Sequence, residues 1–210
     1  KYEEADMIEI LEKSPDRIEA KCEVYGVCGG CSFQHLSSEN QISVKESWLK
    51  SAFMGQAKSA PKKWLNPLQV DSWGYRRKAR LGVRYVAKKE KVLVGFRERK
   101  SSFITVMSRC EVLHPSLGEN LELLGECIGK LSIKTYVPHI EVAIAELDTI
   151  LILRHLEPLT KEDEVILKEY GDKLAITWYT QSAGLDTVRP LIDKVNLTYS
   201  IKDHNIEMTF

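Results

Sequence analysis

Four of the five cysteines in this chain are spaced in a way that suits metal binding. The four are Cys22, Cys28, Cys31 and Cys110. Five residues separate Cys22 from Cys28, two separate Cys28 from Cys31, and 78 separate Cys31 from Cys110. Thiolates are good ligands for soft or borderline metals, and three from one short loop can coordinate a single centre if the backbone bends sharply. The spacing therefore predicts a four-cysteine metal site.

This spacing favours an iron-sulfur cluster over zinc. Structural zinc sites usually use two short pairs of ligands, whereas three clustered cysteines with a distant fourth are more typical of iron-sulfur ligation. Gly26, Gly29 and Gly30 let the loop bend and let backbone amides approach sulfur. A disulfide is less expected because nothing suggests an oxidising compartment, and four unrelated thiols are the simplest alternative. Cys127 lies one step from the apolar stripe of its helix, so we expect it in or near the core.

Charge is distributed unevenly along the chain, although the formal net charge is zero, from 30 basic and 30 acidic side chains. Residues 76–109 contain twelve Lys or Arg and two Glu, a balance of +10, so the remainder carries −10. Phosphate neutralisation by Lys and Arg dominates nucleic-acid affinity, so this segment predicts a surface that attracts a polyanion. A solvated hairpin with charges for solubility is the alternative.

The elements that would position these residues indicate an α+β fold, with a mainly antiparallel β-sheet, covering helices and a cysteine-rich iron-sulfur loop. From residue 75 the pattern has a period of two. One face carries Arg77, Ala79, Leu81, Val83 and Tyr85, and the other carries Arg76, Lys78, Arg80 and Arg84. This strand should turn at 88–91 into a second at 92–97, with 103–107 as the third strand of a meander. Further strands are expected at 5–11, 17–21, 140–145, 149–153, 174–179, 195–201 and 206–210.

Three helices are expected from apolar spacing and caps. The first should begin at a capping box of Ser38 and Gln41, bury Ile42, Leu49 and Phe53, and end near residue 55. The second should open at residue 115 and carry one apolar stripe. Its stripe consists of Leu117, Leu121, Leu124, Ile128 and Leu131. The third should be capped by Thr160 with Asp163 and closed by Gly171.

No stretch approaches the roughly 18 consecutive apolar residues that a membrane helix needs, and the charged start does not resemble a signal peptide. We therefore expect a cytoplasmic protein without membrane association. The chain starts with Lys rather than Met, and its last five residues are predicted to form a strand without a closing turn. We expect an excised piece of a longer protein.

Three stretches resemble one enzyme family. Residues 22–35, Cys-Glu-Val-Tyr-Gly-Val-Cys-Gly-Gly-Cys-Ser-Phe-Gln-His, resemble the cluster loop of the bacterial 23S ribosomal RNA (uracil-5-)-methyltransferases of the RlmD type. Residues 73–81, Trp-Gly-Tyr-Arg-Arg-Lys-Ala-Arg-Leu, resemble that family's entry into its central domain. Residues 94–99 and 109–113 resemble the segment that ends in its fourth cluster ligand. The resemblance is most specific over the first 115 residues and extends over essentially the whole chain.

The resemblance implies a TRAM β-barrel, a central domain with a [4Fe-4S] cluster, and a C-terminal domain that binds S-adenosylmethionine. On this chain the cluster ligands would be Cys22, Cys28, Cys31 and Cys110. The implied division is 1–20 as the remnant of the TRAM-like domain, 21–39 and 72–205 as the central iron-sulfur and RNA-positioning domain, 40–71 as a helical excursion that packs on the methyltransferase domain, and 206–210 as the start of the catalytic domain.

The family's chemistry implies that this piece is inactive alone. A cysteine thiolate attacks uracil C6, C5 takes the methyl group, and a base removes the C5 proton. The chain has no Ser-Cys-Asn-Pro nucleophile motif and no Gly-rich strand-to-helix loop for S-adenosylmethionine. No catalytic or S-adenosylmethionine-binding residue is therefore assigned, and the piece is expected to grip 23S ribosomal RNA. Its expected RNA contacts are Arg76, Arg77, Lys78, Arg80, Arg84 and His35.

Aromatic side chains near the cysteine loop could add to the RNA contacts. Trp73, Tyr75 and Phe33 could stack on unpaired bases, although core packing is an equal alternative. Trp48 and Trp64 are expected to fill the core. Two other functions remain open: a zinc-binding RNA-interaction module without enzymatic activity, and a cluster-bearing redox or regulatory protein without an RNA role. Transfer RNA is a further substrate class, and the sequence gives no sign of the oligomeric state.

Overall fold

The computed structural model describes residue 3 and residues 7–209 of the chain. By contact density the chain divides into two compact units. The first consists of Lys1–Glu23 and Ser32–Val70, and the second of Val24–Cys31 and Asp71–Phe210. The cysteine loop thus belongs to the second unit, while the chain on both sides of it belongs to the first.

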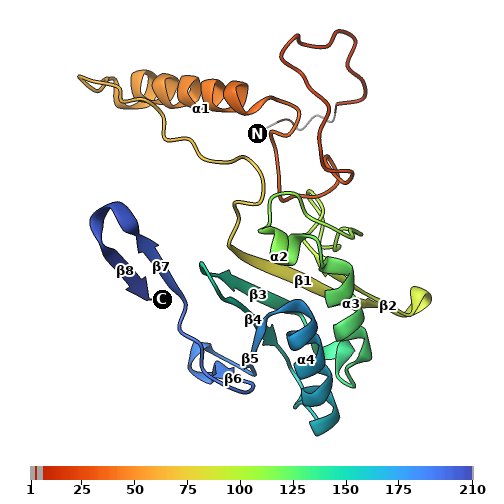
Figure 1. Ribbon diagram of the computed structural model, residues 1–210. Coiled ribbons are helices and arrows are strands. Elements are labelled where there is room, and N and C mark those ends of the chain that lie inside the picture. Colours follow the sequence, from red (N-terminus) through yellow and green to blue (C-terminus); the bar gives the residue numbers. More distant parts are fainter. Residues whose placement is uncertain (1–2, 4–6, 210) are drawn as a thin grey trace. The chain divides into compact units, whose positions relative to one another are not determined.

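A six-stranded sheet forms the centre of the second unit, with strand order β2-β1-β3-β4-β5-β6 (Figure 1). Its strands are β1 Lys78–Val86, β2 Lys91–Gly95, β3 His139–Ile144, β4 Thr149–Arg154, β5 Thr177–Gln181 and β6 Arg189–Pro190. The β4–β5 pair is parallel, whereas β2–β1, β1–β3, β3–β4 and β5–β6 are antiparallel. The sheet is therefore mixed, which corrects the expectation of a mainly antiparallel sheet. The parallel pair arises because a helix crosses over between β4 and β5.

Helices α3 (Leu121–Lys130) and α4 (Lys161–Leu174) pack against the sheet. The predicted capping box of α4 is confirmed, because Thr160 accepts from the Asp163 N–H and Asp163 accepts from the Thr160 N–H. Burial acts to raise the pKa of Asp163, but hydrogen bonds from Ser132 and Thr160 outweigh it and lower that pKa. The helix ends at Ala175 in the left-handed conformation, with φ 52°, rather than at Gly171, which lies inside it.

The predicted helix from residue 115 is two helices. A short α2 (Pro115–Gly118) precedes α3, and Asn120 is the N-cap residue of α3. The apolar stripe expected for one helix is nevertheless buried as a set, since each of its five members is at most 1% exposed. These side chains share one core with the inward face of β1, where Leu81 and Val83 are buried as predicted.

The segment 103–107 is not the third strand of a meander. It meets the chain after β2 through an isolated bridge between Arg97 and Ile104 and a 2.9 Å hydrogen bond from the Thr105 N–H to the Phe96 carbonyl. A Cβ atom at Gly82 would collide with Ile104. Gly82 pairs with Gly95 across β1 and β2, so two glycines provide the space that lets this segment cross the sheet.

The hairpin of β7 (Thr198–Ile201) and β8 (Ile206–Thr209) follows the sheet. The strand predicted over 206–210 is confirmed as far as residue 209, and residue 210 lies outside the described part. Short 3-10 turns occupy Ala87–Lys89, Lys134–Tyr136, Leu185–Thr187 and Lys202–His204. In the described residues, none of the helices combines the length and apolar character needed to cross a bilayer.

The first unit contains α1 (Ser38–Ala52), which continues as a π-helical turn over Phe53–Ala57. Its N-cap is Ser37 rather than Ser38, because Ser37 accepts from the Asn40 N–H. The expectation that this helix buries an apolar face is wrong, since α1 has no buried residue and Leu49 is 50% exposed.

The strands predicted near the start of the chain are absent from its described part. Residues 7–11 and 17–21 form no strand, and residues 5 and 6 of the first run lie outside the described part. A single bridge joins Arg17 to Leu36. The backbone of this segment is therefore paired at isolated positions and does not belong to a sheet.

Candidate metal centre and cation-bearing strand

The cysteine loop, Val24–Cys31, is a tight turn. The N–H groups of Val27 and Cys28 both point to the Val24 carbonyl, at 3.2 and 2.9 Å. Gly26 has φ +94°, a conformation that favours glycine. The loop thus brings Cys28 and Cys31 close together along a strongly bent backbone.

Backbone hydrogen bonds dock this loop on the chain that leaves β2. The Gly29 N–H donates to the Arg97 carbonyl at 2.8 Å, and the Arg99 N–H donates to the Val27 carbonyl at 2.8 Å. A Cβ atom on Gly29 would lie 3.0 Å from the Arg97 oxygen, so a larger residue would press this backbone contact apart by a few tenths of an ångström. The cation-rich segment after β2 is therefore also the support of the cysteine loop.

Three of the predicted ligands belong to the second unit. Cys28 and Cys110 are buried, and Cys31 packs against the core that contains Cys110. The Gly30 N–H donates to Cys28 Sγ at 3.4 Å, which is the amide-to-sulfur contact that the glycines were expected to allow. The Cys110 N–H donates to the Gly118 carbonyl at 2.8 Å, which fixes the backbone of Cys110 against α2.

Cys22 belongs to the first unit, where its N–H donates to Oε1 of the buried Gln34 at 3.1 Å. All five cysteines are free thiols. Cys127 is fully buried in the core, as predicted, and burial raises the pKa of its thiol to about 12. In residue 3 and residues 7–209, no three His, Cys, Asp or Glu side chains are gathered closely enough to hold a metal ion. The predicted ligands are thus all present as free thiols.

The chemistry of the donors nevertheless fits a thiolate-bound metal. A Cβ atom on Gly30 would lie 3.4 Å from Cys28 Sγ and 3.5 Å from the Phe96 ring, so the backbone of this residue lies directly against the sulfur. Metal sites are rarely preformed without their metal, because binding itself draws the ligands together. Free thiols on a glycine-lined loop satisfy the chemical requirement for such binding.

The predicted RNA contacts have different surroundings. The guanidinium of Arg76 lies over the Phe96 ring at 5.4 Å, and Arg77 Nη1 donates to the Ala145 carbonyl at 2.7 Å. Arg80 forms a salt bridge with Glu141 on the neighbouring strand, at 2.5 Å. Lys78 and Arg84 are exposed, and neither has an ion pair in the part of the chain that the structure describes. The exposed cations of β1 are therefore Lys78, Arg80 and Arg84.

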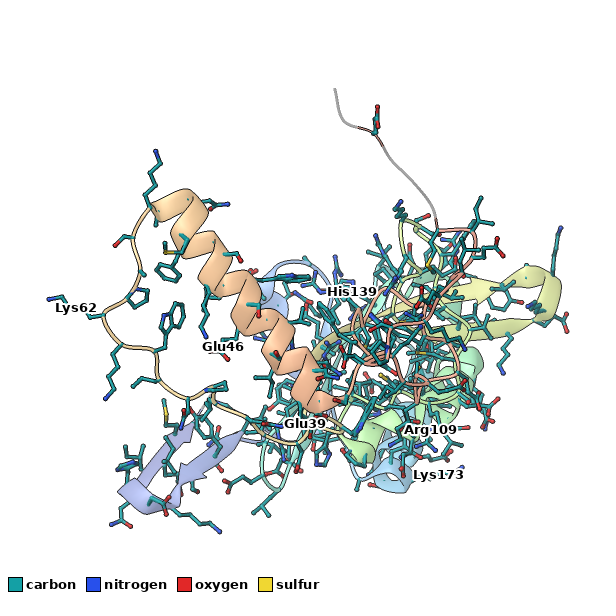
Figure 2. All side chains as sticks on the ribbon, turned by 90° about the horizontal axis from the view of Figure 1, so that it is seen from above. Glu39, Glu46, Lys62, Arg109, His139 and Lys173 are labelled. Atoms are coloured by element: carbon teal, nitrogen blue, oxygen red, sulfur yellow. The ribbon has the colours of Figure 1, made fainter. Side chains whose placement is uncertain are left out.

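Polar residues that the sequence did not single out lie beside this row. His139, which is labelled in Figure 2, pairs in register with Arg154, and its Nε2 is 3.9 Å from Glu141 Oε1. Burial lowers the pKa of His139, the cations of Arg80 and Arg154 lower it further, and Glu141 opposes them. His139 is thus biased toward its neutral form. Only pairing across strands unites these residues, so no local sequence pattern could have predicted the group.

Arg109, next to Cys110, is held by acidic neighbours. Its Nε lies 2.7 Å from Glu111 Oε1, and its Nη2 lies 3.9 Å from Glu119 Oε1. This cation belongs to the basic segment, but its charge is compensated locally.

The first unit contains a cluster of aromatic rings around His35. The rings of Phe33 and His35 are stacked at 6.2 Å and 21°, and the Trp48 ring lies 5.4 Å from Phe33. Lys45 Nζ is 5.9 Å from the Phe33 ring. The expectation that Trp48 fills the core is wrong, because Trp48 is 61% exposed.

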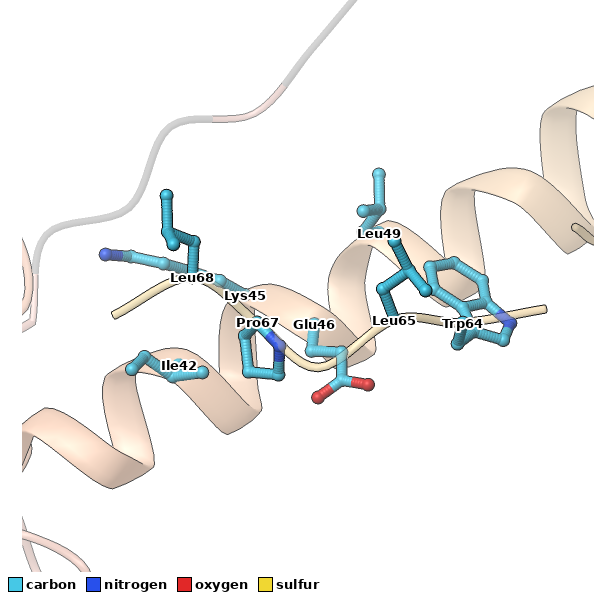
Figure 3. Close-up of a pocket in the computed structure, with 8 residues that line it drawn as sticks. All are labelled: Ile42, Lys45, Glu46, Leu49, Trp64, Leu65, Pro67 and Leu68. Atoms are coloured by element: carbon cyan, nitrogen blue, oxygen red, sulfur yellow. The ribbon is translucent and has the colours of Figure 1, made fainter. Parts of the chain in front are cut away.

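A groove of about 330 Å³ lies between α1 and the segment 64–68 (Figure 3). It is lined by Ile42, Lys45, Glu46, Leu49, Trp64, Leu65, Pro67 and Leu68. Trp64 packs edge-on against Phe53, with ring centroids 5.8 Å apart, but is 36% exposed. Trp64 therefore lines a groove instead of filling a core, contrary to the sequence-based expectation.

Curated proteins similar to this chain include RlmD methyltransferases of several bacteria. The chain is 61% identical over all 210 residues to the "23S rRNA (uracil(1939)-C(5))-methyltransferase RlmD" of Vesicomyosocius okutanii, covering 48% of that protein. It is 44% identical over 211 aligned residues to the RlmD protein of Ralstonia nicotianae, covering 47% of it. The resemblance predicted from the cysteine loop is therefore confirmed, and the chain spans about half the length of the curated relatives it matches. No family model matches the chain.

A solved structure shares the fold. The tRNA (uracil-54, C5)-methyltransferase of Pyrococcus abyssi, in complex with S-adenosyl-L-homocysteine, superposes with a TM-score of 0.63. The match covers 96% of this chain and 47% of that one, with 17% identical residues. At this level of identity the likeness shows a common fold.

Proposed function

We propose that this chain is part of an S-adenosylmethionine-dependent methyltransferase that forms 5-methyluridine in 23S ribosomal RNA. The observation that carries the proposal is the 61% identity, over all 210 residues, to a protein described as an RlmD methyltransferase. The residues of this chain would bind a metal centre and position the RNA. Activation of uracil and binding of S-adenosylmethionine would fall to the part of the relatives that this chain does not match, so the chain alone would not catalyse methylation.

We further propose that Cys22, Cys28, Cys31 and Cys110 are the ligands of a [4Fe-4S] cluster. Such a cluster would supply a rigid cross-link between chain segments far apart in sequence. The cysteine loop would provide two ligands, and Cys110 would provide a third from the chain just before α2. Their free thiols, the Gly30 amide at Cys28 and the buried setting of Cys28 and Cys110 support this assignment. A single zinc ion on the same thiols is the competing proposal.

The exposed row of Lys78, Arg80 and Arg84 would contact RNA phosphates. Alternate residues of a strand point to one face, so these side chains emerge from β1 on the same side, about 7 Å apart for each step of two. Arg76 and Arg77, also expected to contact RNA, are held by the Phe96 ring and the Ala145 carbonyl and would contribute less. Arg80 pairs with Glu141, but its side chain stays 67% exposed. In the first unit, His35 with Phe33 and Trp48 would offer exposed rings on which unpaired bases stack.

Replacing Lys78, Arg80 and Arg84 together with Gln should weaken RNA binding at least about tenfold at moderate salt, because phosphate contacts dominate affinity. The slope of log affinity against log salt should fall by about 2, since roughly 0.7 counterions are released per single-strand contact. Titration of the full chain with a 23S ribosomal RNA fragment at several salt concentrations measures both quantities.

The matched control replaces Lys161, Lys168 and Lys173 of α4 with Gln, which removes the same charge from a helix. This variant should retain most of the affinity. If both triple variants lose equal affinity, then general charge attracts the RNA and the proposed row has no special part in binding.

The groove beside α1 supports a second contact of the whole protein. The segment 40–71 would pack on the catalytic domain, as the family resemblance implies. This contact would cover its own exposed apolar side chains, among them Leu49, Leu65 and Leu68.

Residues 1–20 would be the end of a TRAM-like domain, and residues 206–210 would begin the catalytic domain. A 23S ribosomal RNA substrate would also place the protein in the cytoplasm, where its thiols stay reduced.

A further inference from the structure

Two arginines of the basic segment are directed at the cysteine loop. Arg99 Nη2 donates to the Cys31 carbonyl at 2.8 Å, and its guanidinium lies 5.7 Å from the Tyr25 ring centroid. Arg76 Nη2 donates to the neighbouring Gly30 carbonyl at 3.5 Å. Two cations are therefore bound to consecutive peptide groups of the loop, at the position of one predicted ligand.

The backbones of the same two arginines connect the loop to other parts of the site. The Arg99 N–H donates to the Val27 carbonyl. Arg99 therefore contacts the loop at Val27 through its backbone and at Cys31 through its side chain. The Arg76 N–H donates to the Val112 carbonyl at 2.8 Å, and the Arg76 carbonyl accepts from the His114 N–H at 3.0 Å. Arg76 thus joins the cysteine loop to the segment that begins two residues after Cys110.

The aromatic rings hold these side chains in place. Arg76 lies over Phe96, the residue that follows β2, and Arg99 lies over Tyr25 inside the loop. A guanidinium that stacks on a ring and donates to a carbonyl loses conformational freedom on folding, and it presents a fixed charge to its surroundings. Both arginine side chains are therefore engaged in contacts within the protein, unlike a flexible exposed cation that binds an RNA phosphate.

We infer that Arg76 and Arg99 are positioning residues that hold the cysteine loop and retain its metal. This inference rests on the proposed function, because it takes the loop as a source of metal ligands. A thiolate-bound centre carries net negative charge, so two cations fixed at the Gly30 and Cys31 carbonyls would stabilise the bound thiolates and oppose their release. The same contacts keep the loop folded, which limits access of chelators to the metal.

The test is the rate at which a chelator removes iron from anaerobically purified full chain carrying Arg99→Gln or Arg76→Gln. Loss of a charge-assisted hydrogen bond should speed release about tenfold for Arg99→Gln. The effect should be smaller for Arg76→Gln, whose bond is longer. Arg99→Lys should restore part of the retention, because Lys keeps the charge but lacks the planar guanidinium. Lys168→Gln on α4 is the control and should release iron at the wild-type rate.

A second readout does not depend on iron. In metal-free protein, alkylation of Cys31 by iodoacetamide, followed by mass spectrometry, should be faster in Arg99→Gln than in wild type, because the loop opens more often. If wild type contains no iron but alkylation still differs in this way, the iron-sulfur proposal fails while the positioning role stands. If iron release and Cys31 alkylation both keep their wild-type rates in both Gln variants, the inference is overturned whether or not the protein holds a cluster.

Discussion

Cys110→Ala should abolish iron binding, whereas Cys127→Ala should leave it intact. Both cysteines are buried in the same core of the second unit, and both variants remove the same atom. Only Cys110 has the spacing of a ligand, while burial raises the pKa of the Cys127 thiol to about 12 and makes its thiolate unfavourable. Because a cluster that loses one thiolate ligand is bound far more weakly, the iron content of Cys110→Ala should fall close to zero.

The comparison separates a ligand from a core residue. Cys127→Ala should cost about 1 kcal/mol of unfolding free energy through the small cavity it leaves, without loss of iron. Elemental analysis of the purified variants measures iron, and urea unfolding measures stability. Cys31→Ser adds a case in which the changed residue is only half-buried, so that misfolding is less of a concern. Equal iron in Cys110→Ala and Cys127→Ala would remove Cys110 from the ligand set.

Gly118→Ala should destabilise the protein by about 2–3 kcal/mol, the cost of forcing an atom into a packed core. A Cβ atom at this position would lie 2.6 Å from the Cys110 carbonyl oxygen and 3.0 Å from the Leu113 carbonyl oxygen. Both obstacles are backbone atoms, so the chain around Cys110 must move. The variant should therefore also bind iron less tightly, which chelator competition would measure beside urea unfolding.

Gly129→Ala provides the matched control. Gly129 also lies in a helix, but the nearest atom to its added Cβ is Val92 Cγ2, at 3.9 Å, which is ordinary contact. Alanine should stabilise the protein there by up to about 1 kcal/mol, because it lowers the entropy of the unfolded chain. Wild-type stability in Gly118→Ala would contradict the packing described between α2 and the Cys110 segment.

Local patterns predicted the elements that local physics determines. The alternation along residues 77–85 identified β1 and its inward face, and the Thr160–Asp163 capping box identified the start of α4. The helix stripe from Leu117 to Leu131 identified the core residues correctly, even though the chain breaks into two helices near Asn120. Strand alternation, helical periodicity and capping involve residues only a few positions apart, which is why the sequence alone was sufficient.

Features that depend on distant pairing were missed. The parallel β4–β5 pair arises because α4 connects the two strands across the sheet. The segment 103–107 crosses β1 and β2 instead of pairing as a third strand, because Gly82 and Gly95 face each other on these adjacent strands and leave space for it. The charge pattern of the sequence also predicted that Arg76 contacts an RNA phosphate. Its position over Phe96 and beside Gly30 depends on the docking of the cysteine loop, which no periodicity reveals.

The metal content of the wild-type chain tests the proposed [4Fe-4S] cluster most directly. The protein would be purified without oxygen, its visible spectrum recorded, and iron, sulfide and zinc measured on one sample. We expect a brown protein with about four iron and four sulfide ions per chain. A colourless protein with one zinc ion, or one that takes up no iron and sulfide on reconstitution, would contradict the iron-sulfur assignment.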